Sequence, residues 1–463
     1  MYSLSSTIAA VSTPRGKGGI ATIRISGNDA VKIAGAMFFP RSGRDLSEYR
    51  AREAVFGAIV DADGIECDEG IAVVFRGPAS FTGEDTVELT CHGGLEVTKT
   101  VYLSAIAHGA TAAGPGEFTK RAFINGKMSL TEAEAVGLLI DADTKERMRL
   151  SSGGLKGNVS RDIRGIYDGL LGTMTALYAA IDYPEEDVGD EGEREIGGTL
   201  RTALSRVEKL LGTYKIGAAV ADGVRCAICG RPNVGKSSLF NLMVGEETAI
   251  VTEIEGTTRD VIRETVSFGG VTLRLADTAG LRPSDDTVER IGIDRAAAEI
   301  DTAELVIAVF DGSQPLRDED CGLLGRLKSV SAPVICVINK SDAGCALTDD
   351  ELGEIEASAA AVVRTSARSG GADELAAAIA EIFGSGEVDL ANDAIIWDVR
   401  QREQLEHSRA SLRAAIGGLE AGDGLDCVCT LVEEAMAALD ETDGRGVDER
   451  IVSEIFSRFC VGK

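Results

Sequence analysis

The sequence predicts a multidomain protein of the α/β plus α class, in which an α/β domain with a doubly wound sheet is inserted into a helical bundle. Three observations predict this class. Strand-like and helical runs alternate near the N-terminus, apolar residues at helical spacing flank the centre of the chain, and a Gly-rich loop at the centre joins a strand-like run to a helix-like run. The chain has 463 residues, enough for several domains, and 44% hydrophobic residues supply their cores.

The N-terminal region, residues 1–125, has the pattern of an α+β domain. Short strand-like runs at Ile20–Ile25, Ile71–Phe75 and Thr86–Thr90 alternate with helical stretches. We therefore expect one N-terminal domain that ends near residue 125.

Residues 126–215 and 386–463 are predicted to form the two parts of one helical domain. Pro184 ends the first apolar stripe. The α/β domain, residues 216–385, is expected to be an insertion, because domain termini tend to lie close together at the surface. The apolar positions at helical spacing are Val159, Ile163, Ile166, Leu170, Met174, Leu177 and Ile181, then Leu200, Leu204, Val207, Leu211 and Tyr214, and after the insertion Leu405, Leu412, Ile416, Leu419, Val428, Leu431, Ala435, Val452, Ile455, Phe456 and Phe459.

The inserted domain begins with a phosphate-binding loop, Gly-Arg-Pro-Asn-Val-Gly-Lys-Ser-Ser over residues 230–238. It follows the strand-like run Val224–Cys229 and precedes the helix-like run Ser238–Met243, which is the context that the motif requires. Backbone N–H groups at a helix N-terminus bind phosphate oxygens. Lys236 is expected to reach the β- and γ-phosphates, and Ser237 to ligate Mg²⁺.

Two segments downstream have the features of nucleotide-sensing loops. Gly256–Asp260 lies in a polar stretch and offers Thr258 as a second hydroxyl for Mg²⁺. A predicted β-hairpin over residues 262–276 follows. At its end, the carboxylate of Asp277 can hold a Mg²⁺-bound water, and the N–H of Gly280 can meet the γ-phosphate.

A guanine-recognition motif follows two buried-strand runs, Leu305–Phe310 and Val334–Ile338. It reads Asn-Lys-Ser-Asp, residues 339–342, and its last carboxylate can accept both N–H groups of guanine, whereas adenine leaves it unpaired. Thr365–Ala367 follows a further apolar run and fits the loop behind the base. These ordered elements predict a Ras-like P-loop GTPase domain.

One position departs from the Ras pattern. Leu281 stands where the Ras group has the glutamine that orients the attacking water, and leucine cannot orient water. The acidic stretch Asp285–Glu289 is the expected source of another group.

The overall charge limits the classes of partner. A formal charge of −28 argues against a broad nucleic-acid-binding face, so RNA contact requires a local patch or a partner. The N-terminus lacks a signal-peptide pattern, and no apolar run approaches membrane-span length, so we expect a cytoplasmic protein. Most of the ten cysteines lie in apolar patterns, and the three histidines show no metal-ligand spacing.

The whole chain resembles the MnmE (TrmE) family of tRNA uridine-modification GTPases. Its last five residues, Phe-Cys-Val-Gly-Lys at 459–463, match the family's Phe-Cys-x-Gly-Lys ending. Further matching motifs extend over essentially the full length: Arg24–Gly27, Ser80–Asp85, His92–Gly94, Pro115–Phe118, Arg121–Asn125, Gly256–Asp260 and Val288–Ile293.

The resemblance implies a role in tRNA modification with a flavin-dependent partner, MnmG (GidA), in a heterotetramer or larger assembly. The pair would add a (carboxymethyl)aminomethyl-type group to C5 of the wobble uridine of certain tRNAs. The N-terminal domain would have the folate-binding fold of aminomethyltransferases, form a homodimer, and hold 5,10-methylene- or 5-formyl-tetrahydrofolate. Arg24, Glu88, Lys127 and Lys463 would contact the folate, the cations at its glutamate tail and the carboxylate at pterin N–H groups.

Family members use K⁺ in place of an arginine finger, where two GTPase domains meet across their nucleotides. Asn233 would ligate K⁺ by its side chain, with Thr252, Ile254 and Thr257 at the positions that match the family's backbone ligands. Glu289 matches the family's water-orienting glutamate and is the expected catalytic residue, acting through a bridging water. The full expected GTP-binding set is Asn233, Val234, Gly235, Lys236, Ser237, Ser238, Thr252, Thr257, Thr258, Asp277, Thr278, Ala279, Gly280, Asn339, Lys340, Asp342, Ser366 and Ala367.

Cys460 is the second residue expected to act in catalysis. Its thiolate would attack an electrophilic carbon, such as C6 of the uridine, or capture a one-carbon unit; positioning, or a redox-sensitive contact with the folate, is the alternative role. We also hypothesise that GTP hydrolysis drives a conformational step, which the helices transmit to the folate site.

Two other functions compete with this interpretation. A ribosome-assembly or RNA-associated regulatory GTPase would carry a KH-like RNA module or a second GTPase copy, and the sequence shows neither a Gly-x-x-Gly loop with basic flanks nor a repeat. A binding switch whose N-terminal domain only dimerises is the other. Binding of 5-formyl-tetrahydrofolate separates that switch from the enzyme.

Overall fold

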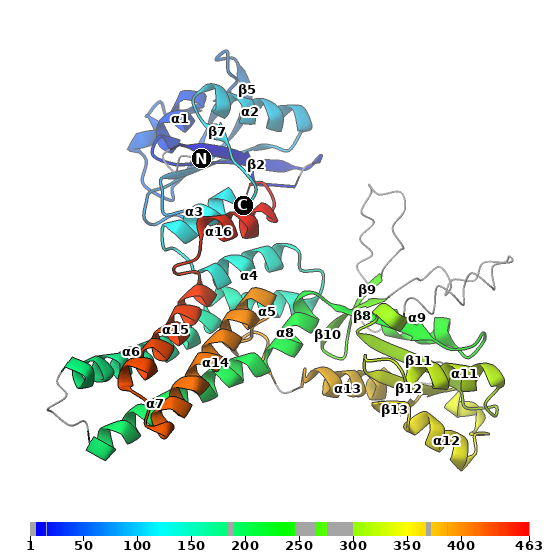
Figure 1. The fold of residues 1–463 in the computed structure, drawn as a ribbon. Helices are drawn as coiled ribbons and strands as arrows, with labels where there is room; N and C mark the ends of the chain where they lie inside the picture. The colour runs from blue at the N-terminus through cyan, green and yellow to red at the C-terminus, as the bar shows by residue number, and fades with distance from the viewer. Residues whose placement is uncertain are drawn as a thin grey trace. The chain divides into compact units, whose positions relative to one another are not determined.

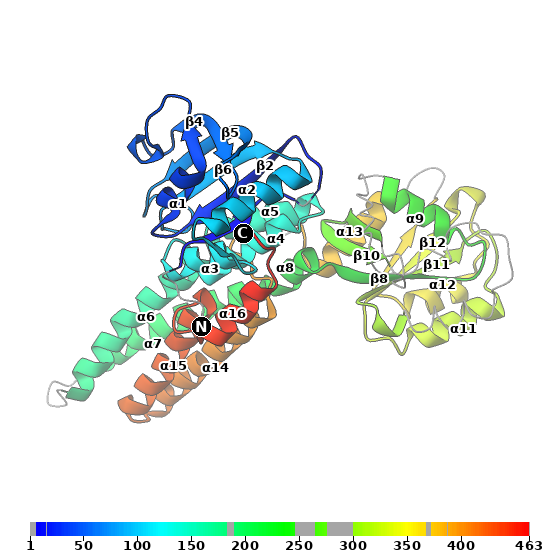
Figure 2. The same ribbon diagram turned by 90° about the horizontal axis from the view of Figure 1, so that it is seen from above.

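The computed structural model describes residues 6–14, 16–182, 189–245, 264–275, 300–366, 372–386 and 388–462. The chain divides into two compact units, Met1–Gly137 together with Asp443–Lys463, and Leu138–Thr442 (Figures 1 and 2). These units do not coincide with the expected domains: residues 126–137 fall in the first unit, and the second unit contains both the helical region and the inserted α/β region. The last helix, α16 (Glu449–Ser457), belongs to the first unit, whereas the sequence places residues 386–463 in the helical domain.

The first unit is built on a seven-stranded sheet of order β3-β4-β5-β6-β2-β1-β7. Its neighbours are antiparallel except β1 and β7, which are parallel. The three strand-like runs predicted from the sequence are confirmed as β2, β6 and part of β5. The strands are β1 (Ile8–Val11), β2 (Ile20–Ser26), β3 (Phe38–Pro40), β4 (Ala54–Val60), β5 (Glu66–Phe75), β6 (Thr86–His92) and β7 (Thr111–Ala112).

Alternation along these strands decides which sheet face is buried. On β2, Ile23 and Ile25 are buried, and on β6 Val87 and Leu89 are buried, while the residues between them point to the other face. The buried residues form one core with the helices α1 (Ala30–Met37) and α2 (Leu95–Ala107). The other face carries Arg24 of β2 and Glu88 of β6.

A smaller apolar cluster explains why α16 joins this unit. Val452 and Phe456 pack with Leu130 and Ala133 of α4 (Leu130–Ile140), and all four side chains are buried. The short helices η1 (Leu46–Glu48) and α3 (Glu117–Ile124) complete the unit.

The helical part of the second unit includes residues from before and after the inserted domain. One buried cluster takes Ile163 and Leu200 from the first flank and Leu405 and Leu439 from the second. The helices α6, α7, α14 and α15 therefore share a core, and they lie side by side in Figures 1 and 2. The helices are α5 (Lys145–Leu155), α6 (Asn158–Asp182), α7 (Gly189–Gly212), α8 (Tyr214–Ala221), α14 (Val399–Ala421) and α15 (Leu425–Asp443).

The inserted domain holds a six-stranded sheet of order β13-β12-β11-β8-β10-β9, in which only β9 is antiparallel. Figure 2 shows α9 and α13 on one side of this sheet and α11 and α12 on the other, which is the doubly wound arrangement that the sequence predicts. The elements are β8 (Val224–Cys229), α9 (Lys236–Gly245), β9 (Glu264–Phe268), β10 (Val271–Leu275), β11 (Leu305–Asp311), α11 (Asp318–Leu327), β12 (Val334–Asn339), η3 (Ser341–Ala343), α12 (Asp349–Glu356), β13 (Ala361–Arg364) and α13 (Ala372–Phe383).

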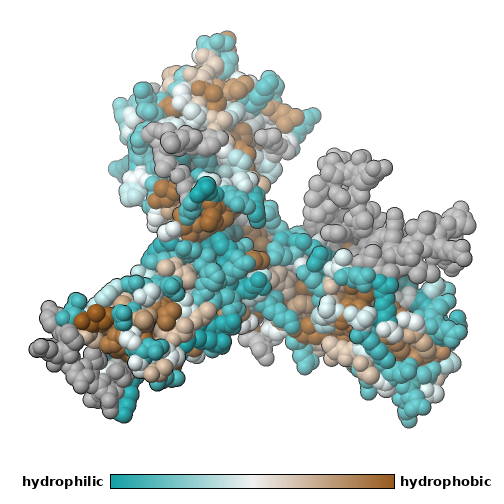
Figure 3. All heavy atoms as spheres, viewed as in Figure 1, coloured by the Kyte–Doolittle hydropathy of each residue, from teal (hydrophilic) through white to brown (hydrophobic). Residues whose placement is uncertain are grey.

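The surface agrees with the composition. The face drawn in Figure 3 is mostly hydrophilic, with hydrophobic residues in separate patches. In the ranges that the structure describes, no helix has both the length and the apolar character needed to cross a bilayer.

Candidate functional site

The phosphate loop lies where the sequence predicts it, between the end of β8 and the start of α9. Gly230 and Gly235 have φ angles of 145° and 104°, and Asn233 has a φ of 64°. A Cβ at Gly230 would overlap the carbonyl oxygen of Val309 on the neighbouring β11, so this position requires glycine. The tight turn directs the chain into α9, whose N-terminus favours an anion.

Lys236 lies across this loop. Its ammonium group donates to the carbonyl oxygens of Gly230 at 2.7 Å and Arg231 at 2.9 Å. Burial lowers its pKa from the ordinary value. A partly desolvated cation held by two carbonyl dipoles is well placed to move onto phosphate oxygens, which are stronger acceptors.

The guanine motif lies at the adjacent strand ends. Asn339 ends β12 and is buried, and its side-chain amide donates to the carbonyl oxygen of Val234 in the phosphate loop at 2.8 Å. Ser366 donates its hydroxyl to Asp342 Oδ1 at 2.7 Å, so the loop after β13 meets the carboxylate of the motif. The structure thus brings together the phosphate loop, the guanine motif and the base-backing loop.

Several expected site residues lie outside the described residues. Of the residues expected to hold the two cations, the structure describes two. Ser237, expected for Mg²⁺, lies in the first turn of α9, and Asn233, expected for K⁺, is exposed in the loop. Both supply oxygen donors next to the phosphate-binding N-terminus, and oxygen is what hard cations prefer. The expected residues that the structure does not describe are Thr252, Ile254, Thr257, Thr258, Asp277, Thr278, Ala279, Gly280, Glu289, Ala367 and Lys463.

The structure also shows charged residues that the sequence analysis did not single out. Asp311 at the end of β11 and Asp320 on α11 are buried and form ion pairs with Arg231 of the phosphate loop. One signal was available in the sequence: Asp311 ends a buried-strand run in the same way as Asn339.

In the first unit, Arg24 and Glu88, two of the residues expected to contact folate, lie next to each other. They are direct partners on β2 and β6, and the Arg24 guanidinium donates from Nε at 2.9 Å, with Nη2 at 2.8 Å, to Glu88 Oε1. The guanidinium carbon lies 5.5 Å from the ring centroid of Phe81 and 5.6 Å from that of Phe118. Lys127 is farther along the chain and donates to the carbonyl oxygen of Pro78 at 2.8 Å.

The C-terminal segment returns to this unit. The N–H of Gly116 donates to the carbonyl oxygen of Cys460 at 3.2 Å, and Ser12 Oγ donates to the carbonyl oxygen of Gly462 at 3.1 Å. Cys460 is exposed. Gly116 is the N-cap of α3, the helix that also carries Phe118 beside Arg24. The segment that bears Cys460 therefore packs at the start of a helix that contacts the Arg24–Glu88 pair.

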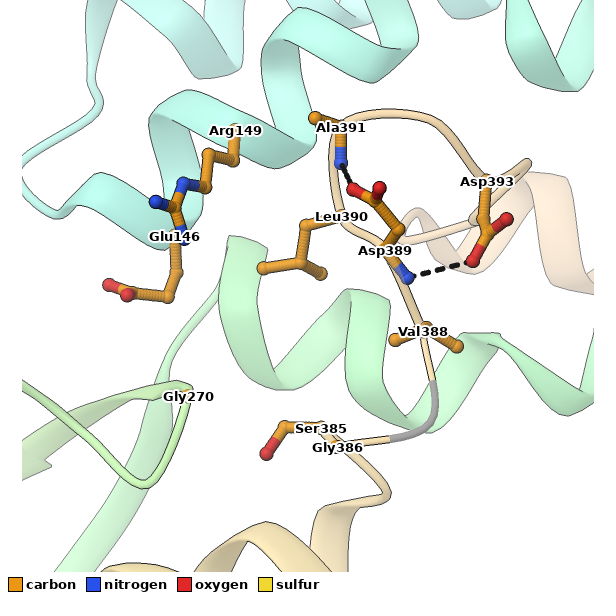
Figure 4. Close-up of a pocket in the computed structure, with 10 residues that line it drawn as sticks. All are labelled: Glu146, Arg149, Gly270, Ser385, Gly386, Val388, Asp389, Leu390, Ala391 and Asp393. Carbon is orange, nitrogen blue, oxygen red and sulfur yellow. Dashed lines mark hydrogen bonds between the residues drawn. The ribbon is translucent and has the colours of Figure 1, made fainter.

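A cleft of about 660 Å³ lies elsewhere in the second unit. Figure 4 shows Glu146 and Arg149 of α5 facing the turn at Gly270 and the segment after α13. Asp389 holds its own turn, with its carboxylate accepting from the N–H of Ala391 at 3.0 Å. Of the predicted site residues that the structure describes, none lines this cleft.

The inserted domain therefore defines a P-loop nucleotide-binding protein of the GTPase class, because the phosphate loop and a guanine-specific motif are joined on one doubly wound sheet. Comparison with family models identifies the family. The model for the MnmE helical domain matches residues 130–460, and the model for the GTP-binding protein TrmE N-terminus matches residues 7–127.

Curated relatives match over the full chain. The protein of Symbiobacterium thermophilum named tRNA modification GTPase MnmE is 43% identical over 458 residues, covering 99% of both chains. The protein of the same name from Geobacillus kaustophilus is 39% identical over 459 residues, again covering 99% of both chains. The chain belongs to the MnmE (TrmE) family. Among solved structures, the G domain of the T. maritima FeoB iron transporter aligns at 28% identity with a TM-score of 0.26, covering 34% of this chain and 97% of that one; this likeness carries no part of the assignment.

Proposed function

We propose that this protein, a tRNA-modification GTPase by its family, uses GTP hydrolysis to drive a one-carbon modification at C5 of the wobble uridine of certain tRNAs. One observation carries the GTPase part: Asn339 of the guanine motif is hydrogen-bonded to Val234 of the phosphate loop, which supports one site for both ends of GTP. The test is GTP hydrolysis by the full chain, with mass spectrometry of wobble nucleosides from cells that lack it. Unchanged nucleosides in those cells would refute the tRNA role.

We propose Mg²⁺ and K⁺ as the cations of the nucleotide site. Ser237 would hold Mg²⁺ together with Thr258, and Asn233 would hold K⁺ together with Thr252, Ile254 and Thr257. When bound, K⁺ supplies the positive charge that an arginine finger supplies in other GTPases. Glu289 is proposed to orient the attacking water through a second water, since Leu281 has no polar group for that task. GTPase domains of two chains would face each other in this step.

The first unit is proposed to bind a tetrahydrofolate one-carbon donor. The support is the Arg24–Glu88 pair, which is only 18% and 29% exposed at its side chains and is flanked by Phe81 and Phe118. Aromatic rings beside a hydrogen-bonding carboxylate and a cation suit a flat heterocycle that carries an acidic tail. Lys127 and Lys463 would complete the site, and Cys460 would act in the chemistry next to it.

Three further parts of the proposal follow from the family. The chain would form a homodimer through its N-terminal domain, and Phe56 and Ile71, which are neighbours on β4 and β5 and are 54% and 43% exposed, offer apolar surface for this contact. It would work in the cytoplasm with a flavin-dependent MnmG-type partner and tRNA. The net charge of −28 favours a partner that supplies most of the RNA-binding surface.

The link between GTP hydrolysis and the helices is proposed to run through the β9–β10 hairpin. Ser267 of β9 donates to the Glu146 carboxylate of α5, and Thr272 of β10 lies 3.2 Å from Thr144 between their hydroxyl oxygens. Ser385, after α13, donates to the carbonyl oxygen of Gly269 in the hairpin turn at 2.6 Å. These contacts support transmission because both expected nucleotide-sensing segments flank the hairpin in the chain.

A further inference from the structure

The end of β11 carries a buried carboxylate between the two halves of the nucleotide site. Strand β11 pairs with β8, which leads into the phosphate loop, and with β12, which leads into the guanine motif. Asp311 is its last residue, pairs in register with Asn339, and is 3% exposed. The sheet topology therefore places this carboxylate midway between phosphate and base recognition.

The Asp311 carboxylate lies between two positively charged side chains. Lys340 of the guanine motif donates from Nζ to Asp311 Oδ2 at 2.7 Å, and Arg231 Nη2 of the phosphate loop lies 3.7 Å from the same oxygen. The other carboxylate oxygen, Oδ1, accepts from the N–H of Ser313 at 3.1 Å and from its hydroxyl at 2.6 Å. Burial raises the pKa of the Asp311 carboxyl, but the hydrogen bonds from Lys340 and Ser313 outweigh it, and the pKa lies below its ordinary value.

The contacts continue on the phosphate-loop side. Arg231 donates from Nε to Asp320 Oδ2 at 3.0 Å, and both side chains are almost fully buried. Within the described chain, Asp320 Oδ1 is buried without a hydrogen-bond partner. The carbonyl oxygen of Arg231 in turn accepts from Lys236. One chain of polar contacts thus runs from Lys340 through Asp311 and Arg231 to Lys236.

In the guanine motif, the residue that contacts Asp311 has an unusual backbone conformation. Lys340 has a φ of 62°, a left-handed conformation that costs free energy in a residue with a side chain. Its neighbours on either side are Asn339, which binds the phosphate loop, and the Ser341–Ala343 turn, which carries Asp342. The contact with Asp311 anchors the Lys340 side chain beside the turn in which Asp342 accepts from Ser366.

We propose that Asp311 is a positioning residue for guanine-nucleotide binding, which joins the phosphate loop to the guanine motif through Arg231 and Lys340. The proposal rests on the GTPase assignment and adds a residue outside the motifs. A nucleotide holds both halves at once, so a protein that fixes their separation beforehand binds it more tightly. Loss of the contacts through Asp311 would then speed nucleotide dissociation and leave the rate of the hydrolysis step nearly unchanged.

The test is Asp311→Asn in the full chain, because asparagine keeps the volume and the acceptor for Ser313 but removes the charge. We expect the dissociation constant for fluorescently labelled GDP to rise about tenfold or more, mostly through faster dissociation. The kcat at saturating GTP is expected to stay within about threefold. Asp350→Asn, at an exposed aspartate of α12, is the matched control and should leave both values unchanged.

A double-mutant cycle distinguishes positioning from general stability. If Asp311 acts through Lys340, then Asp311→Asn in a Lys340→Gln background should add less than about twofold to the dissociation constant. Full additivity in this cycle overturns the proposal, as does wild-type GDP affinity in the single variant. A variant that no longer folds at 25 °C, by circular dichroism, overturns it as well, since Asp311 would then be a stability residue. If neither variant nor wild type binds guanine nucleotides at all, the GTPase assignment itself fails.

Discussion

Gly235 and Asn339 lie so close that no Cβ fits between them. A Cβ built on Gly235 would overlap Asn339 Nδ2, the atom that donates to Val234, and Gly235 has a φ of 104°, which L side chains rarely adopt. The phosphate loop and the guanine motif are therefore in direct backbone-to-side-chain contact. This contact gives the first prediction.

Gly235→Ala is expected to weaken GDP binding about tenfold or more, because the alanine must displace Asn339 and adopt a strained φ. Titration with fluorescent GDP measures the effect. Gly353→Ala is the matched control, since Gly353 lies within α12 with open space around its Cβ direction. It should leave GDP affinity unchanged and raise stability by up to about 1 kcal/mol. Equal effects of the two substitutions would contradict the prediction.

Asp342→Asn is expected to change the base that the site accepts. Its carboxylate already accepts from Ser366, and guanine would supply further N–H donors. Asparagine has only one side-chain oxygen, and its NH2 group would face the amino group of guanine, so GDP affinity should fall about a hundredfold or more. Xanthosine diphosphate has a carbonyl at that position and should bind. Competition between the two nucleotides is the measurement. A variant that keeps its preference for GDP would show that Asp342 does not read the base.

Replacing K⁺ by Na⁺ is expected to slow GTP hydrolysis by about a hundredfold or more. Na⁺ is smaller and fits a K⁺ site poorly, so the positive charge at the phosphates would be lost. Asn233→Gly tests the proposed ligand, since glycine tolerates the φ of 64° while removing the side-chain oxygen. It should abolish the K⁺ dependence and leave GDP affinity within about threefold. Equal rates of the wild type in the two salts would rule out the potassium mechanism.

Arg24→Ala is expected to abolish binding of 5-formyl-tetrahydrofolate in isothermal titration, because it removes the cation and leaves Glu88 without its partner. Arg41→Ala provides a control in the same sheet. Arg41 also pairs with glutamates, Glu66 and Glu69, but all three side chains are about half exposed. Surface pairs of this kind contribute little, so folate binding should persist in that variant. Retained binding in Arg24→Ala would exclude the proposed site.

Glu146→Gln is expected to separate GTP hydrolysis from tRNA modification. It weakens the hydrogen bond from Ser267 without touching the nucleotide site, so hydrolysis should stay within about threefold while modification falls about fivefold or more. Glu195→Gln, at an exposed glutamate of α7, is the control. Coupling through the hairpin is refuted if both variants modify tRNA at the wild-type rate.

Local sequence was sufficient for the parts of the site whose chemistry is local. The strand-like run Val224–Cys229 is β8 residue for residue, and the predicted hairpin is β9–β10. Apolar runs predict such strands because a central parallel strand is buried on both faces, and every residue of β11 is buried. The phosphate loop can also be predicted from local sequence, since only glycine fits at its two tight positions.

Contacts between residues far apart in the chain were decided by the tertiary structure. The sequence shows Arg231 and Asp320 separately, but only the order of strands in the sheet reveals that Asp311 lies between the phosphate loop and Lys340. In the same way, the apolar stripe of α16 is consistent with the helical bundle, but its Phe456 packs against Leu130 in the N-terminal unit. Periodicity tells which face of a helix is buried; the partner of that face depends on the free energy of packing the whole chain.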